Sequence, residues 1–145
     1  MDWKQYISAA ALVVSIGSCT LSYNLSRQSA ITSVRPVLVF QYELGSGWSL
    51  RNVGNGPALN ILIAMKKDDR AEWAQPMRIP PLPKDGLFSL QKWPVYGGAR
   101  VLGASYFDVQ QRPYSTSCVN DLSTIQEGNV LKTWPDDAIR RHWAP

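Results

Sequence analysis

The chain has very few of the side chains that carry catalysis and metal binding. Its 145 residues include one histidine and two cysteines. A typical structural zinc site needs four Cys or His ligands, most of them in closely spaced pairs, so the sequence excludes one. We therefore predict no catalytic, cofactor-binding or metal-binding residues, and no cofactor.

The two cysteines are also too few for a disulfide framework. Cys19 lies in an apolar segment near the N-terminus, whereas Cys118 lies far along a more polar part of the chain. We expect the two thiols in different phases, which argues against a bond between them. Secreted domains more often carry paired cysteines, so we expect the soluble part in a reducing compartment, the cytoplasm.

The sequence has no long run of basic residues. Lys and Arg number 15 against 11 Asp and Glu, which gives a net charge of +4. The basic residues are scattered, whereas a nucleic-acid-binding surface gathers them on one element. We expect no nucleic acid as a partner, and the mild positive charge instead favours an anionic bilayer surface.

The most informative absence is that of charge from Gln5 to Ser26. As a helix rising 1.5 Å per residue, this stretch is about 33 Å long, enough to cross a hydrocarbon core of about 30 Å. We therefore predict that residues 1–26 form a membrane-spanning signal anchor. The side chains expected within the membrane or at its surfaces include Tyr6, Leu12, Val13, Val14, Ile16, Leu21 and Tyr23.

Two other hypotheses exist for this segment. A cleaved signal peptide lacks a good cleavage site here. A lipoprotein signal is the stronger alternative, because residues 16–19 (Ile-Gly-Ser-Cys) loosely resemble a lipobox. Cleavage before Cys19 and acylation of its thiol would place the domain outside the cytoplasm. The apolar run continues to Leu25, which favours the anchor, while the flanking positive charges are balanced and do not set the orientation.

Small residues recur along the predicted helix. Ala11, Ser15, Cys19 and Ser22 follow one another at spacings of four, four and three, which places them on one face. Small faces let two membrane helices approach closely, so this face predicts a homo-oligomer formed through the helix. The alternative is that small residues are simply common in such helices.

Beyond a helical stalk over residues 27–35, the pattern changes to that of strands. Arg35-Pro36 ends the helix, since a proline disfavours helical backbone in the residue before it. Short apolar and β-branched runs then alternate with turn residues, which predicts an immunoglobulin-like antiparallel β-sandwich over residues 36–119. The strands of this mainly β fold, about seven, are expected at residues 37–44, 48–53, 58–65, 77–79, 87–90, 99–107 and 113–119.

A loop rich in glycine and asparagine joins the second and third of these strands. Its glycines permit positive φ, its asparagines can bond nearby backbone and its proline fixes φ, which predicts a tight, rigid connection. Phosphate binding is disfavoured, because a strand and not a helix follows the loop, and no lysine follows it until Lys66. The loop residues are Asn52, Gly54, Asn55, Gly56 and Pro57.

Three segments in order carry a resemblance. They are the helix that runs into Arg35-Pro36, the run at residues 50–61, and residues 106–116. Together they resemble a large, mostly uncharacterised group of small bacterial membrane-anchored proteins with one N-terminal helix and one β-sandwich domain. Asn-Val-Gly-Asn-Gly-Pro-Ala, at residues 52–58, is the most specific part. The group's hairpin usually reads Asp-x-x-Gly-Arg, so Gln111 at the glycine position predicts another turn type; the group implies no activity.

Residues 120–145 have a different composition and are predicted to form a tail with a short helix. Thr133, with Asp136 three residues later, has the pattern of a helix start. Acidic residues follow in the first turn and basic residues in the last, as the helix dipole favours. Ile139 and Trp143, four residues apart, would pack this helix on the sandwich.

An enzyme is the least favoured class. A hydrolase would have to use Asp108, Cys118 or His142, but nothing in the sequence indicates that these residues lie together. The acidic pairs at residues 68–69 and 136–137 have the chemistry of a cation site, yet such pairs beside basic residues are usually solvated turns or helix starts.

Six tryptophans are many for this length. Those in or near loops and the tail suit an exposed aromatic surface for another protein, although packing beneath loops would use them equally well. We therefore predict a non-enzymatic, single-pass protein of the cell (inner) membrane that serves as a protein-interaction or membrane-complex accessory module. The tryptophans of the predicted surface are Trp73, Trp93, Trp134 and Trp143.

Overall fold

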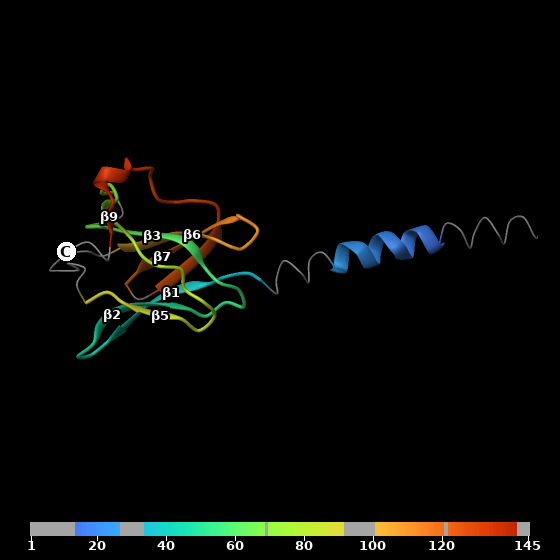
Figure 1. The fold of residues 1–145 in the computed structure, drawn as a ribbon, viewed down its shortest axis with the longest axis horizontal. Coiled ribbons are helices and arrows are strands. Elements are labelled where there is room, and N and C mark those ends of the chain that lie inside the picture. The colour runs from blue at the N-terminus through green and yellow to red at the C-terminus, as the bar shows by residue number, and fades with distance from the viewer. Residues whose placement is uncertain (1–13, 27–33, 69, 92–100, 121, 142–145) are drawn as a thin grey trace, which may run out of the picture. The chain divides into compact units, whose positions relative to one another are not determined.

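A computed structural model describes residues 14–26, 34–68, 70–91, 101–120 and 122–141. The chain divides into two units, Met1–Ser33 and Val34–Pro145. The first unit contains a helix and the second contains all the strands (Figure 1).

The helix of the first unit covers residues 14–26. Its apolar side chains are exposed, and two of its hydroxyls bond back to its own carbonyls, Ser18 to Val14 and Thr20 to Gly17, both at 2.9 Å. No helix within the described residues is both long and apolar enough to cross a bilayer. The described helix is therefore shorter than the span predicted for residues 1–26. Of the predicted membrane and small-face residues, Tyr6, Ala11, Leu12 and Val13 lie outside the described part of the chain.

The second unit consists of two sheets. The small sheet is antiparallel and has the order β1-β2-β5. The large sheet has the order β8-β7-β6-β3-β4-β9, in which the first five strands are antiparallel and the short β9 pairs parallel to β4. The strands are β1 (Leu38–Glu43), β2 (Gly47–Asn52), β3 (Leu59–Lys66), β4 (Ala74–Arg78), β5 (Leu87–Ser89), β6 (Val101–Phe107), β7 (Pro113–Val119), β8 (Leu122–Glu127) and β9 (Arg140–Arg141).

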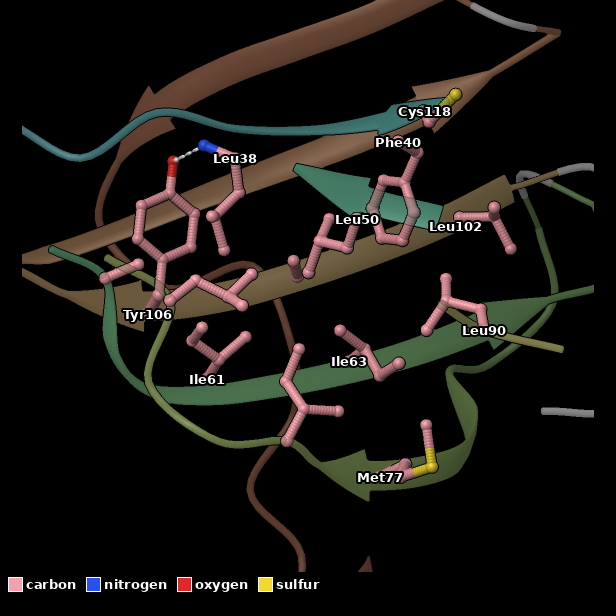
Figure 2. Packing of buried hydrophobic residues seen from close by; sticks show 14 of the residues in the cluster. Leu38, Phe40, Leu50, Ile61, Ile63, Met77, Leu90, Leu102, Tyr106 and Cys118 are labelled. Atoms are coloured by element: carbon pink, nitrogen blue, oxygen red, sulfur yellow. Dashed lines mark hydrogen bonds between the residues drawn. The ribbon is translucent and has the colours of Figure 1, made fainter. Parts of the chain in front are cut away.

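The hydrophobic core lies between the two sheets (Figure 2). Alternate residues of each strand point inward, as the two-residue period of a strand requires. Leu38 and Leu50 of the small sheet and Ile61 and Ile63 of the large sheet have no exposed surface. Burying such a side chain stabilises the fold by roughly 1.5–3 kcal/mol. Two antiparallel sheets around a shared core are consistent with the predicted β-sandwich.

Each of the seven predicted strand segments overlaps a strand, β1 to β7, although β4 (Ala74–Arg78) begins three residues before the segment predicted at residues 77–79. The prediction that the strands end at residue 119 is wrong, because β8 follows at once and β9 comes later. β8 was missed because most of its side chains are exposed, so its sequence lacks the alternation of apolar and polar residues that marks a half-buried strand.

The predicted C-terminal helix is wrong as well. The described residues contain only a 3₁₀ turn, η1 (Asp136–Ala138), whose N-cap is Pro135 and which has no side-chain cap. Acidic residues do occupy its first turn, but no basic residue occupies its last. The chain is extended at Ile139, and Arg140–Arg141 pair with β4, so backbone pairing at a sheet edge replaces the helix. Trp143 lies outside the described residues.

Candidate functional site

The most elaborate polar cluster of the described residues surrounds Asn52, where the chain enters the second unit. This side chain is fully buried at the end of β2. Its Oδ1 accepts hydrogen bonds from the backbone N–H of Val37 at 3.2 Å and of Gly54 at 3.0 Å. One side-chain oxygen therefore joins the segment before β1 to the loop after β2.

The Nδ2 of Asn52 bonds a third part of the chain. It donates to the carbonyl of Gly56 at 2.8 Å and to those of Leu82 and Pro83, both at 3.1 Å. An amide N–H₂ group has two hydrogens, so three close carbonyls saturate it. The asparagine thus crosslinks the incoming segment, its own loop and the turn before β5.

The two glycines of the loop are required by close backbone contact. A Cβ on Gly54 would lie 2.3 Å from the nitrogen of Val37, and one on Gly56 would lie 1.9 Å from the carbonyl oxygen of Val34. Any side chain there would push the incoming segment away. Neither glycine uses the positive φ that it permits, since the described glycines with positive φ are Gly45, Gly47 and Gly128.

Arg35 fixes the incoming segment from both its backbone and its side chain. Its carbonyl accepts hydrogen bonds from the N–H groups of Asn55 at 3.0 Å and Gly56 at 3.3 Å. Its guanidinium carbon lies 5.3 Å from the ring centroid of Tyr114, a cation–π contact. The Arg35 Nε is buried without a hydrogen-bond partner among the described residues. We call residues 34–37 and 52–57, with these contacts, the N-terminal junction.

The first residue of β1 is bonded directly to the large sheet. The Leu38 N–H donates to the Tyr106 hydroxyl at 3.3 Å, and the Leu38 carbonyl accepts from the Thr116 hydroxyl at 2.7 Å (Figure 2 shows the first of these). The two hydroxyls are 3.2 Å apart. Burial raises the pKa of Tyr106 above its ordinary 10.0. The start of β1 is thus held by both sheets.

Asp108 closes the hairpin between β6 and β7. It has no exposed surface, and its Oδ1 accepts hydrogen bonds from the N–H groups of Gln110 at 2.7 Å and Arg112 at 2.9 Å. The Tyr114 hydroxyl donates to its Oδ2 at 3.5 Å. Gln111 has a φ of 60°, the left-handed backbone that the usual glycine would adopt. The hydrogen bonds of this carboxylate are made within its own hairpin turn, so its role is to stabilise the turn.

The residues of the hydrolase alternative are not assembled by the described structure. Cys118 is buried, with 2% of its surface exposed, and lies four residues beyond Tyr114, about 13 Å along β7. Asp108 is at the far end of that strand, and His142 lies outside the described residues. The described residues hold no group of three His, Cys, Asp or Glu side chains suited to a metal ion.

The structure describes two of the four tryptophans of the predicted surface, Trp73 and Trp134, and both are half-buried. Trp73 is half-buried: a Cβ on Gly103 would lie 2.5 Å from its ring, and the Lys66 Nζ lies 5.0 Å from its centroid. It therefore packs on the outer face of β6. Trp134 is also half-buried, and Trp93 and Trp143 lie outside the described residues.

An exposed apolar group that sequence reasoning missed lies at the tip of the β1–β2 hairpin. Leu44 is 94% exposed and Tyr42 56% exposed. Tyr42 pairs across the strands with Trp48, with ring centroids 5.3 Å apart. The turn at residues 44–46 places Tyr42 and Trp48 opposite each other, and the Gly-Ser-Gly run at residues 45–47 is the sequence signal for such a turn. Trp48 is half-buried and also packs against the core; we call Tyr42, Leu44 and Trp48 the hairpin tip.

Comparison with protein families, with curated proteins and with solved structures finds no match for this chain. The resemblance carried by residues 50–61 and 106–116 therefore stays a prediction. The function has to be argued from the residues and their geometry.

Proposed function

We propose that this chain is a non-enzymatic, single-pass protein of the bacterial inner membrane, whose sandwich domain binds another protein on the cytoplasmic side. The observation that carries the proposal is the N-terminal junction. Its buried hydrogen bonds hold the segment by which an N-terminal anchor is attached to the domain.

The helix at residues 14–26 supports the anchor. It has no charged residue, and its large side chains are exposed, with Val14 67%, Leu21 63% and Tyr23 68% exposed. An uncharged helix whose large apolar side chains are all exposed is stabilised by an apolar environment, either a protein core or a bilayer. The hydroxyls of Ser18 and Thr20 bond to the helix's own carbonyls, which suits a medium without water.

The N-terminal junction supports the proposal that the domain is attached to the membrane through its N-terminus. Burying a polar side chain is costly unless its hydrogen bonds are made, and Asn52 makes five of them, two of which connect its Oδ1 to Val37 and Gly54. A disordered N-terminal arm would need no such contact. In a domain attached through its N-terminus, such contacts make the point of attachment part of the folded structure.

Strand order supports an immunoglobulin-like sandwich. The small sheet β1-β2-β5 corresponds to strands A-B-E of that fold, and the run β7-β6-β3-β4 corresponds to G-F-C-C′. β8 is an addition beyond G, and the B and F equivalents carry no cysteine. Domains of this architecture commonly act as binding modules, which favours a protein partner.

The hairpin tip supports a binding role. Tyr and Trp are enriched among the residues that dominate protein–protein affinity, and an exposed leucine beside them adds apolar area. β1 begins at the junction and ends at the tip, so the two lie at opposite ends of the strand, roughly 17–20 Å apart. The apolar group is therefore well separated from the point of tethering.

Alkaline extraction of bacterial membranes that contain the full chain tests the anchor. We expect the protein to stay in the membrane pellet. The double variant Ile16→Arg, Leu21→Arg should move to the supernatant, because a charged residue in mid-membrane costs roughly 2.5–3.5 kcal/mol on insertion scales. Leu44→Arg, the same change at the hairpin tip, is the matched control and should stay in the pellet. Extraction of the unaltered chain would contradict the proposal.

Intact mass separates the anchor from the lipoprotein alternative. The anchor predicts a chain that retains residues 1–18, whereas acylation at Cys19 removes them and adds lipid. The side of the membrane is tested with a Gln110→Cys, Cys19→Ser variant and a membrane-impermeant thiol reagent, since Gln110 is exposed. We expect labelling only after the cells are permeabilised; labelling of intact cells would place the domain outside.

A further inference from the structure

β8 is an open sheet edge. It lies at the end of the large sheet, and no described strand pairs with its outer side. Natural edge strands are usually shortened, or protected by lysine or proline. β8 has six residues, Leu-Ser-Thr-Ile-Gln-Glu, with neither lysine nor proline and with one charge, at Glu127. Five of its six side chains are exposed.

The other sheet edges of the described structure offer less unbonded backbone. β5 has three residues and β9 has two, which is too short to add a strand. On β1, the N–H and carbonyl of Leu38 are already bonded to Tyr106 and Thr116. β8 is thus the edge with the longest unprotected backbone.

The pairing with β7 fixes which residues face the open side. Gly128 donates to the carbonyl of Pro113 at 2.9 Å, so these two residues form a hydrogen-bonded pair. Such pairs recur every second residue in an antiparallel ladder, and they place the backbone groups of Leu122, Thr124 and Gln126 toward β7. The N–H and carbonyl groups of Ser123, Ile125 and Glu127 therefore point outward.

We propose that β8 pairs antiparallel with β8 of a second copy of this chain, about a two-fold axis at Ile125. In this register Ile125 lies opposite its own counterpart, and Ser123 lies opposite Glu127 of the second copy. These are the residues whose backbone groups point outward, so about six backbone hydrogen bonds form across the axis. A register displaced by one residue would oppose groups already bonded to β7.

The side chains of β8 suit a second copy. A two-fold axis perpendicular to the sheet keeps the faces matched, so Ile125 meets Ile125, an apolar β-branched pair, and Thr124 meets Gln126. The single carboxylate, Glu127, meets the Ser123 hydroxyl and not another carboxylate. The contact closes on itself, because each copy uses the same strand and no open β8 edge is left. It holds whether or not residues 1–26 cross a membrane.

A charge-swap series tests both the dimer and its register. The full chain, purified in detergent micelles, should show a concentration-dependent dimer in sedimentation velocity experiments. Ser123→Glu places a carboxylate against Glu127 at both ends of the pairing and should raise the dimer Kd about tenfold. Adding Glu127→Lys to that variant should restore the dimer. Within one chain the two positions are about 13 Å apart, so the rescue can act only between copies.

Thr124→Glu is the matched control, because it adds the same charge one residue away, where it meets Gln126 of the second copy, and should leave the Kd unchanged. A chain that stays monomeric at every concentration overturns the proposal and leaves the β8 edge to a strand of another protein. A dimer that does not respond to Ser123→Glu also overturns it and locates the contact elsewhere, for example on the small face of the helix. A dimer weakened equally by Thr124→Glu overturns the register.

Discussion

Asn52 is the residue on which the junction depends most. Its side chain makes five hydrogen bonds with no exposed surface. Asn52→Ala leaves several buried backbone groups without a partner, and we expect it to lower the free energy of unfolding by about 2–4 kcal/mol. Urea denaturation of the full chain in micelles measures this loss.

Asn55→Ala is the control for this prediction. The side chain of Asn55 is exposed, and its contact with Arg35 is made by its backbone N–H, which the variant keeps. Surface substitutions of this kind usually change the unfolding free energy by less than about 0.5 kcal/mol. Equal losses of unfolding free energy in Asn52→Ala and Asn55→Ala would show that the buried hydrogen bonds of Asn52 do not stabilise the fold.

Tyr114 makes the stability depend on alkaline pH. Burial raises the pKa of its hydroxyl above the ordinary 10.0, and the negative charges of Asp108 and Glu127 add to the effect. Below pH 10 both folded and unfolded states hold the proton. Above pH 10 the unfolded state releases it first, so stability falls as the pH rises through the folded pKa.

Tyr114→Phe should therefore reduce this decline above about pH 10, while the buried Tyr106, whose pKa is also raised, keeps its own share of it. The variant loses only one long hydrogen bond, the 3.5 Å contact with Asp108. Unfolding free energies measured at several pH values give the slope for each protein. An unchanged slope would mean that other groups cause the alkaline loss.

At the scale of the elements, the β6–β7 hairpin carries a correctable strain. Gln111 has a φ of 60°, a backbone conformation that costs a residue with a Cβ roughly 1 kcal/mol. Gln111→Gly should raise the free energy of unfolding by about 0.5–1 kcal/mol, seen as a higher urea midpoint with an unchanged m-value. Gln110→Gly, one residue away in the same turn, should lower it. Similar responses at both positions would refute the role of φ.

The elements also show what sequence patterns can and cannot determine. Strands β1 to β7 were predictable because apolar residues alternate or cluster between turn signals. β8 was not, since an exposed edge strand is ordered by backbone pairing and leaves no apolar pattern. The helix prediction for the C-terminal tail failed for a related reason. The charges of the tail suit a helix, but residues 140–141 pair with β4, and local propensity cannot predict a tertiary contact of this kind.

The candidate site was predictable only in part. The loop at residues 52–57 could be recognised as tight and rigid from its glycines and asparagines. The partner that makes the glycines necessary could not, because residues 34–37 approach them through the fold and not through local sequence. In the same way, the carboxylate of Asp108 made it a catalytic candidate in the sequence. Only its hydrogen bonds from the N–H groups of Gln110 and Arg112 show that it stabilises a turn.

At the scale of the whole molecule, residues 34–37 are a fixed part of the sandwich domain. Their hydrogen bonds to the loop after β2 make them part of the second unit's own fold. An N-terminal anchor, as proposed, would then be attached to folded backbone.

Hydrogen exchange at the Asn55 and Gly56 amides, which both donate to the Arg35 carbonyl, tests this claim most directly. In the full chain we expect these amides to exchange as slowly as those of the central strand β3, and to lose protection in Asn52→Ala. Exchange as fast as at the exposed turn of residues 44–46 would contradict the account, because the incoming segment would then be loose and the junction would hold nothing.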